Sequence, residues 1–441
     1  MCIRDRDSRL IKKDCLFFAL KGQNFDGNEF AIEALRKGAK FAIVDRSSIA
    51  KKNNRLILVE DSLKALQELA QYHRKQIATK IIALTGSNGK TTTKDFLHNV
   101  LSYYEPTFSA PESFNNELGI TLSKAKLSNM DKYAIFEVGM NMKDEICHLS
   151  NLINPDIAII TNIGEAHIGN LGSKENIAIE KSNIIEGMSS GGVVLLPRDS
   201  DYFELLQKKV SGKKLRYITF GHSNKSDIQI TEISRVKDRI LLKFRIFGEI
   251  FQTSSDIQNI SIFNNYLPVL GIANILNYDL DETLKNIENS RLHKSRWQEF
   301  DFEFDGGQIK LIDDSYNASP TSMFDAIESI DSYRGEQIFR KIIIIGDMLE
   351  LGDLSDKYHS ELVNRINRTN IDHVYFCGEY LTPVFSKLSP KKRKKQFKSI
   401  EYIHSIDNFK LKRGDLIFIK GSNKIGLNNL VQEFINYLAL S

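Results

Sequence analysis

Residues 85–93, Thr-Gly-Ser-Asn-Gly-Lys-Thr-Thr-Thr, have the residue types of a phosphate-binding loop. The apolar run 81–84 precedes them and helical spacing follows over 94–101, so the pattern predicts a buried strand, a tight loop and a helix N-terminus. Loop amides and the positive end of a helix dipole attract phosphate, and Lys90 adds a mobile cation. Because two residues separate the glycines where the common phosphate-loop pattern has four, an ordinary strand-to-helix turn is the alternative interpretation.

Two further polar side chains follow apolar, strand-like runs. Glu137 closes the run 133–138, and His167 comes shortly after the run 157–161. A carboxylate beside a phosphate loop is a candidate magnesium ligand, because Mg²⁺ binds hard oxygens and bridges nucleotide phosphates. Position alone is equally compatible with a solvated carboxylate at a strand end, and a lone histidine is more often structural than a ligand.

The strand-like runs alternate with helical stretches from about residue 79 to 294 and again from about 295 to 441. Such alternation is typical of parallel sheets covered by helices on both faces, and ligands of these sheets bind at the carboxyl ends of the strands. After residue 220 the apolar period changes to two, which predicts an antiparallel flap. The fold class is therefore expected to be α/β.

Composition restricts the class of protein further. The 441 residues are too many for one core and suggest two to four domains, and a net charge of +4 gives no reason to expect nucleic acid as a partner. The basic run 391–395 is interpreted as a solvated loop. The four scattered cysteines and the lack of a membrane-length apolar run predict a cytoplasmic protein without a membrane span. No strongly apolar surface stripe is evident, so we expect a monomer.

Three motifs together resemble the Mur ligase family of ATP-dependent, amide-forming bacterial enzymes. They are the loop 85–91, Asp-Asp-Ser-Tyr-Asn-Ala-Ser-Pro at 313–320, and Gly-Asp-Met-Leu-Glu-Leu-Gly at 346–352. The resemblance implies an N-terminal UDP-substrate-binding domain, a central parallel-sheet P-loop ATPase domain and a C-terminal Rossmann-like ligase domain. Their expected bounds are 1–78, 79–294 and 295–441. Because the family's first domain begins further upstream, Met1–Arg6 is expected to be a foreign or truncated start, with part of that domain missing.

The resemblance also implies roles that the patterns alone leave open. Asn115 and Asn116, which could otherwise simply form a turn, would lie beside the reacting groups, and Asn265 would contact adenine. Arg296, preceded by Ser295 where the family has glycine, would reach the γ-phosphate from the C-terminal domain. The expected contacts of ATP are Thr85, Gly86, Ser87, Asn88, Gly89, Lys90, Thr91, Thr92, Asn265, Arg296 and Asp314.

A metal site follows from the same resemblance. Lys181 lies 14 residues after His167 (181 − 167), a spacing similar to the family's second metal site, where carbon dioxide carbamylates the lysine. Carbamylation requires the neutral amine, so a buried lysine with a lowered pKa is suited to it. Thr91 and Glu137 would hold one Mg²⁺, and Glu137, His167 and carbamylated Lys181 a second. The expected catalytic set is Lys90, Asn115, Asn116, Glu137, His167, Lys181 and Arg296.

Within the family, the two C-terminal motifs are similar to those of ligases that join D-alanyl-D-alanine to UDP-N-acetylmuramoyl-tripeptide in peptidoglycan synthesis. The implied reaction converts the tripeptide carboxylate into an acyl phosphate, which the dipeptide amine attacks to give the pentapeptide, ADP and phosphate. A domain hinge is expected near 290–300. Ligases that add other amino acids, including folylpolyglutamate synthase, share the ATP loop and remain alternatives. So do a nucleotide kinase and a non-catalytic nucleotide-binding module.

Overall fold

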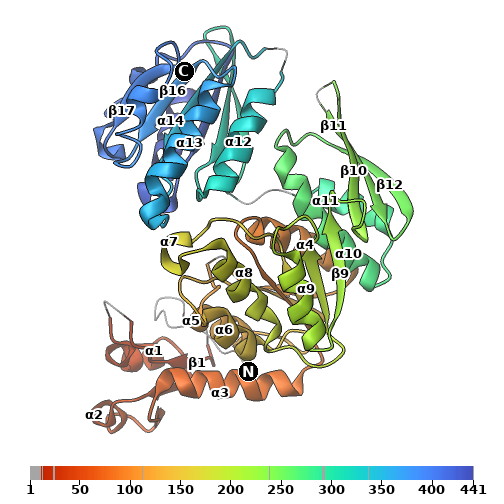
Figure 1. Ribbon diagram of the computed structural model, residues 1–441. Coiled ribbons are helices and arrows are strands. Elements are labelled where there is room, and N and C mark those ends of the chain that lie inside the picture. Colours follow the sequence, from red (N-terminus) through yellow and green to blue (C-terminus); the bar gives the residue numbers. More distant parts are fainter. Residues whose placement is uncertain are drawn as a thin grey trace.

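A computed structural model describes residues 11, 13–22, 25–111, 113–237, 239–290, 294–335 and 337–440. In this part of the chain, three sheets with their covering helices follow one another along the sequence (Figure 1). The predicted α/β class is confirmed. The expectation of an altered start at Met1–Arg6 lies outside the described residues.

The first sheet is small and wholly parallel, with the order β1-β2-β3. Its long helix α3 begins behind Asp61, whose carboxylate accepts a hydrogen bond from Lys64 N at 2.9 Å and so caps the helix. The helix α3 packs against a helix of the following unit, which joins the two. The elements are β1 Leu16–Phe18, α1 Ala31–Arg36, β2 Phe41–Val44, α2 Ser47–Ala50, β3 Leu56–Leu58 and α3 Ser62–Gln76.

Within the described residues the central sheet has nine strands, in the order β12-β11-β10-β9-β8-β7-β4-β6-β5. The pairing is parallel from β5 to β10 and antiparallel from β10 to β12, so the predicted antiparallel flap is confirmed. The flap continues the sheet, because Ile228 pairs in parallel with Phe220 of β9. The strands are β4 Lys80–Thr85, β5 Thr107–Ser109, β6 Tyr133–Glu137, β7 Ile157–Ile160, β8 Val193–Pro197, β9 Arg216–Gly221, β10 Ile228–Val236, β11 Arg239–Ile246 and β12 Glu249–Ser255.

Helices cover both faces of this sheet, which explains why its middle strands are apolar at almost every position. All residues of β6 and β7 are buried, as parallel strands between two helical layers require. The helices are α4 Lys90–Tyr104, α5 Glu117–Ala125, α6 Glu145–Ile153, α7 Ile168–Leu171, α8 Lys174–Ser182, α9 Phe203–Gly212, α10 Tyr266–Ile275 and α11 Leu280–Glu288.

The C-terminal sheet has the order β13-β14-β18-β15-β16-β17 and is parallel except for the hairpin of β13 and β14. The basic run 391–395 was expected to be a loop, but Arg393, Lys394 and Lys395 begin the edge strand β17. The backbones of Arg393 and Lys395 pair with β16 on either side of a register shift, and the side chains of Lys394 and Lys395 are exposed. Pairing with β16 therefore overrides the low strand propensity of this run. The elements are β13 Gln298–Phe304, β14 Gly307–Asp314, α12 Pro320–Ser332, β15 Arg340–Gly346, α13 Ser355–Asn367, β16 His373–Cys377, β17 Arg393–Phe397, β18 Asp415–Lys420 and α14 Leu427–Ala439.

The C-terminal unit lies above the central one in Figure 1, with α7 on the side that faces it. A short 3-10 helix of the C-terminal unit, η5 (Gly352–Leu354), contacts α7. None of the helices in the described ranges combines the length and the apolar character needed to cross a membrane.

Candidate active site

The predicted phosphate loop connects β4 to α4, and its two glycines are required by close packing. Gly89 has φ 78°, a left-handed conformation that favours glycine, and a Cβ there would lie 2.1 Å from Asn265 Oδ1. A Cβ on Gly86 would lie 1.8 Å from Thr161 Oγ1. The loop therefore approaches its neighbours more closely than any side chain would allow.

The segment that follows β7 holds this loop in place. Thr161 Oγ1 donates to Asn88 O at 2.6 Å, and Asn88 N donates to Asn162 Oδ1 at 2.8 Å. Ser87 Oγ donates to Gly164 O at 3.0 Å. These three bonds join the loop to the segment that follows β7.

Lys90 begins α4 and folds back over the loop. Its Nζ donates to Gly86 O at 2.7 Å. Burial lowers the pKa of Lys90, the nearby Glu137 carboxylate opposes this shift, and the Arg296 guanidinium adds to it. Among the described residues, its hydrogen-bond partner is this neutral carbonyl, which a phosphate oxygen could replace.

Glu137 ends β6 beside the loop and is almost wholly buried. Thr91 Oγ1 donates to its Oε2 at 2.9 Å, and Asn115 Nδ2 lies 3.5 Å from its Oε1. Burial alone raises the pKa of Glu137, but the positive charges of Lys90 and its neighbours outweigh burial and hold the pKa below its usual value. A hydroxyl and an ionised carboxylate that touch at the edge of a cavity fit the oxygen donors that Mg²⁺ requires.

Arg296 reaches the same place from the C-terminal unit. Its Nη2 donates to Thr91 Oγ1 at 2.8 Å, and its guanidinium lies 4.0 Å from the ring centre of Tyr316. Its Nε is buried without a hydrogen-bond partner among the described residues, so a donor is left for an anionic group. The preceding Ser295 has φ 59°, a left-handed backbone conformation that favours glycine.

Asp314 ends β14 and is held by two partners. Its Oδ2 lies 2.6 Å from Lys420 Nζ, and its Oδ1 accepts from Trp297 N at 3.2 Å. Burial raises the pKa of Asp314, although Lys420 and Arg296 oppose this shift. The Asp314 carboxylate thus anchors Trp297, the residue that follows Arg296. A direct contact between Asp314 and the nucleotide stays a prediction.

The three predicted asparagines lie beside the loop. Asn265 accepts from Thr93 Oγ1 at 3.1 Å and donates to Ile262 O at 3.0 Å, which engages both ends of its amide. Asn116 is the N-cap of α5 and accepts from Gly119 N at 2.9 Å, so the local structural role that the sequence left open is present. The adenine contact of Asn265 and the catalytic roles of Asn115 and Asn116 stay predictions.

His167 and Lys181 differ in their surroundings. His167 lines the cavity, and its Nδ1 lies 2.7 Å from Glu350 Oε2 of the C-terminal unit. Lys181, in α8, is 1% exposed, and burial followed by repulsion from Lys90 lowers its pKa well below the usual value. The Glu180 carboxylate opposes this shift. The described residues contain no preformed cluster of three His, Cys, Asp or Glu for a metal.

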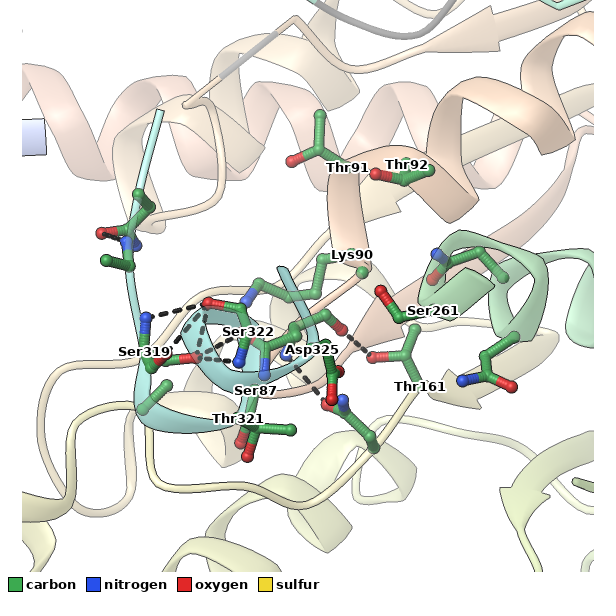
Figure 2. Close-up of a pocket in the computed structure, with 18 of the residues that line it drawn as sticks. Ser87, Lys90, Thr91, Thr92, Thr161, Ser261, Ser319, Thr321, Ser322 and Asp325 are labelled. Atoms are coloured by element: carbon green, nitrogen blue, oxygen red, sulfur yellow. Dashed lines mark hydrogen bonds between the residues drawn. The ribbon is translucent and has the colours of Figure 1, made fainter. Parts of the chain in front are cut away.

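Most of the predicted residues border one cavity of about 720 Å³, which the central and C-terminal units form together. Figure 2 shows Ser319 and Ser322 beside Ser87, with Lys90 near them, and Thr161 and Ser261 further along the cavity. Of the predicted residues, Thr85, Gly86 and Lys181 are absent from the lining. Those that line it are Ser87, Asn88, Gly89, Lys90, Thr91, Thr92, Asn115, Asn116, Glu137, His167, Asn265, Arg296 and Asp314.

Sequence reasoning missed the polar contacts between the units. Ser319 Oγ donates to Asn88 Oδ1 at 2.8 Å, and Thr321 Oγ1 donates to Glu165 Oε2 at 2.5 Å. Asp325 also lines the cavity, and burial raises its pKa to about 6. Ser319 belongs to the quoted motif 313–320, which could have drawn attention to it, whereas nothing in the sequence pairs Thr321 with Glu165.

Fold and site together define a phosphate-loop α/β protein in which a second α/β domain completes the cavity. Three family models match the chain: the Mur ligase family catalytic domain over residues 6–74, the Mur ligase middle domain over 84–279, and the Mur ligase glutamate ligase domain over 296–423. The chain belongs to the Mur ligase family.

Individual relatives show which members of the family this chain is similar to. The UDP-N-acetylmuramoyl-tripeptide–D-alanyl-D-alanine ligase of Bacillus subtilis is 34% identical, with 97% of this chain and 92% of that protein covered. The enzyme of the same name from Rickettsia prowazekii is 33% identical, with 97% and 94% covered. Among solved structures, the MurF ligase of Thermotoga maritima in complex with ADP has a TM-score of 0.85 at 25% identity, with 99% of this chain and 98% of that chain covered.

Proposed function

We propose that this protein joins D-alanyl-D-alanine to UDP-N-acetylmuramoyl-tripeptide at the expense of ATP, in peptidoglycan precursor synthesis. The observation that carries the proposal is the shared cavity, in which the loop cation Lys90, the Thr91–Glu137 pair and the incoming Arg296 meet. The relatives with this name cover nearly the whole chain, and a solved neighbour holds ADP. Together these features support an ATP-dependent amide-forming ligase.

The chain's own groups have clear parts in this reaction. A carboxylate does not react usefully with an amine in water, so its oxygen first takes the γ-phosphoryl group of ATP to form an acyl phosphate and ADP. Lys90 and the loop amides hold the phosphates, and Arg296 stabilises the charge that develops on the transferred group. The dipeptide amine then attacks the acyl carbon, the C–O bond to phosphate breaks, and the amine proton leaves with solvent or phosphate. The free Nε of Arg296 supports its contact with an anion.

Magnesium, when bound, supplies positive charge that neutralises the phosphate oxygens. Thr91 and Glu137 would hold it beside the nucleotide, and Glu137 would share a second ion with His167 and carbamylated Lys181. The neutral Lys181 amine would attack the carbon of CO₂: a C–N bond forms as one C=O π bond breaks, and the amine proton leaves to solvent. An anionic carbamate then replaces the neutral amine. The burial of Lys181 supports this, because burial favours the neutral amine.

The cavity is completed within a single chain, which supports a monomer as the active form. ATP and the UDP-linked substrate place the proposed reaction in the bacterial cytoplasm. The residue bounds 1–78, 79–294 and 295–441 remain our proposed domains.

The proposal is tested by ADP release with Mg²⁺, ATP and UDP-N-acetylmuramoyl-tripeptide, measured with and without D-alanyl-D-alanine. We expect ADP release that depends on the dipeptide, with the pentapeptide product identified by mass. Lys90→Met should abolish both. D-alanine, L-glutamate and meso-diaminopimelate serve as control acceptors. A strong preference for one of them would overturn the proposed acceptor, and ADP release with a phosphorylated product that needs no amine would favour a kinase.

A further inference from the structure

Two loops, one from each unit, touch at the border of the cavity. Residues 165–169 lead from β7 into α7, and residues 347–352 follow β15 on the C-terminal side. Gly169 N donates to Glu350 O at 3.0 Å, and a Cβ on Gly169 would lie 2.5 Å from Gly352 N. The two backbones are therefore in direct contact. Figure 1 agrees, because α7 lies on the side of the central unit that faces the C-terminal unit.

The side chains of His167 and Glu350 face each other at this contact. His167 Nδ1 lies 2.7 Å from Glu350 Oε2, which is an ion-pair distance when the ring is protonated. Both residues have a left-handed backbone, with φ 66° and φ 64°. Such a conformation is uncommon outside glycine and tends to persist where the surrounding structure requires it. Because two such residues meet across this interface, we infer that the surrounding structure holds both backbones in place for a functional contact.

This contact decides which nitrogen of His167 is available to the cavity. With Nδ1 turned to Glu350, Nε2 is the remaining ring nitrogen of a residue that lines the cavity. The described residues of the central unit form no hydrogen bond with either nitrogen, so the orienting group comes from the other domain. A carboxylate on one ring nitrogen is the usual way in which a protein fixes the tautomer and direction of a metal-binding histidine.

We propose that Glu350 is a positioning residue that acts on His167 across the domain interface. It holds the ring with Nε2 towards the cavity, so the complete metal site forms when the C-terminal domain is in contact. Phosphoryl transfer is thereby tied to the closed arrangement, in which Arg296 also reaches Thr91. The inference rests on the proposed function in one respect, because it takes His167 as a magnesium ligand.

The test measures the binding of Mn²⁺ to the whole chain in the presence of saturating ADP. Electron paramagnetic resonance detects the bound Mn²⁺. The variants are Glu350→Gln, which can still accept from His167, and Glu350→Ala, which cannot. Their main-chain contact with Gly169 is retained. Glu379→Gln, an exposed carboxylate of the same domain that does not line the cavity, is the matched control.

We expect wild-type protein to bind two Mn²⁺ ions, with the affinity of the second reduced about 10- to 100-fold by Glu350→Ala and less by Glu350→Gln. The first ion and the midpoint of thermal unfolding should be unchanged. In a His167→Ala background, Glu350→Ala should cause no additional loss, because the residue on which it acts is gone.

Unchanged Mn²⁺ affinity in Glu350→Ala would overturn the inference. So would a single Mn²⁺ site in the wild type, or an equal loss with and without His167. The measurement needs no dipeptide. Absence of dipeptide-dependent ADP release together with the expected Mn²⁺ losses would reject the proposed acceptor alone, whereas normal ligation with unchanged Mn²⁺ binding would reject the role of Glu350 alone.

Discussion

Arg296 and Thr91 are 205 positions apart in the chain and meet in the cavity, where a single hydroxyl accepts from the arginine and donates to Glu137. The guanidinium also packs on Tyr316, and this stacking fixes its plane. A planar guanidinium with donors in a rigid fork suits arginine to a phosphoryl group, whereas the lysine ammonium is a compact point charge without that fork.

Arg296→Lys should therefore lower kcat on the order of 10²-fold, because one stabilising donor of the transition state is lost. The KM for ATP should change less, since Lys90 and the loop amides are intact. Arg198→Lys is the matched control, because the Arg198 guanidinium lies 4.0 Å from the Phe203 ring centre without lining the cavity. Steady-state ADP release measures kcat for both variants. Equal losses of kcat would show that the loss of stacking explains the effect, and would contradict a role of Arg296 in stabilising the transition state.

Lys181→Arg should abolish pentapeptide synthesis while ATP still binds, because a guanidinium cannot form a carbamate and stays charged. Lys208→Arg, on the exposed face of α9, is the control and should be neutral. Since arginine is larger than the buried lysine it replaces, the wild type is also examined by carbon NMR with ¹³C-bicarbonate. A carbamate signal that Lys181→Arg lacks is expected; a folded and active Lys181→Arg variant contradicts the assignment.

The element that positions these residues is the junction of strand and following loop, at the carboxyl ends of β4, β6 and β7. Much of this could be predicted from the sequence, because runs of buried apolar residues ending in glycine, threonine or glutamate are local signals. The strand predicted at 81–84 extends over Lys80–Thr85, for example. The loop predicted at 391–395 was wrong in part, since the neighbouring β16, and not local preference, makes Arg393–Phe397 a strand.

Contacts between units could not be predicted in the same way. The bond from Ser319 to Asn88 joins residues 231 positions apart, and neither side chain carries a pattern that names its partner. His167 was found through its family spacing, but Glu350 was not assigned a role, because its position depends on a left-handed turn that sequence alone does not reveal.

Gly169→Ala tests the contact between α7 and η5. An added Cβ would lie 2.5 Å from Gly352 N and 2.9 Å from Glu350 O, so the two backbones must separate. We expect kcat to fall about 10²-fold, as for small displacements of catalytic groups, with ATP affinity retained. Gly212→Ala meets no atom within 4 Å and should leave kcat unchanged. Calorimetric titration with an ATP analogue accompanies the assay, and wild-type kcat in Gly169→Ala would rule out a functional contact.

Lys124 connects three helices and gives a pH effect of known sign. Buried in α5, its Nζ donates to Gln71 Oε1 of α3 at 3.0 Å and to Leu152 O of α6, and burial lowers its pKa to about 7. Between this value and the ordinary value near 10, the unfolded chain binds a proton that the folded chain does not. The contribution of Lys124 to stability therefore rises with pH in that window.

Wild-type stability against urea should accordingly increase more steeply from pH 7 to 9 than that of Lys124→Met, by at most about 1.4 kcal/mol per pH unit. Subtracting the free energy of unfolding of Lys124→Met from that of the wild type at each pH cancels the contributions of the other titrating groups. Parallel pH profiles would show that the buried amine keeps its proton.

At the scale of the molecule, the cavity depends on two domains whose contacts at its edge are polar: Arg296 to Thr91, Ser319 to Asn88, and Thr321 to Glu165. Polar interfaces between domains are readily opened, so ligands that bridge them should shift the chain towards the closed arrangement. We expect the radius of gyration from solution X-ray scattering to fall when an ATP analogue, Mg²⁺ and UDP-N-acetylmuramoyl-tripeptide are added together. Scattering that does not change would contradict a hinge near 290–300.

The position of β18 has a consequence for how the molecule is made. This strand, Asp415–Lys420, comes last among the strands of the described residues, yet it is inserted between β14 and β15 and pairs with both. During synthesis, β14 and the isoleucine-rich β15 therefore leave the ribosome each with an open edge, which stays unpaired until β18 is made. A chain that terminates early loses the centre of a sheet and not its margin, so the whole C-terminal domain, and with it half of the cavity, fails to assemble.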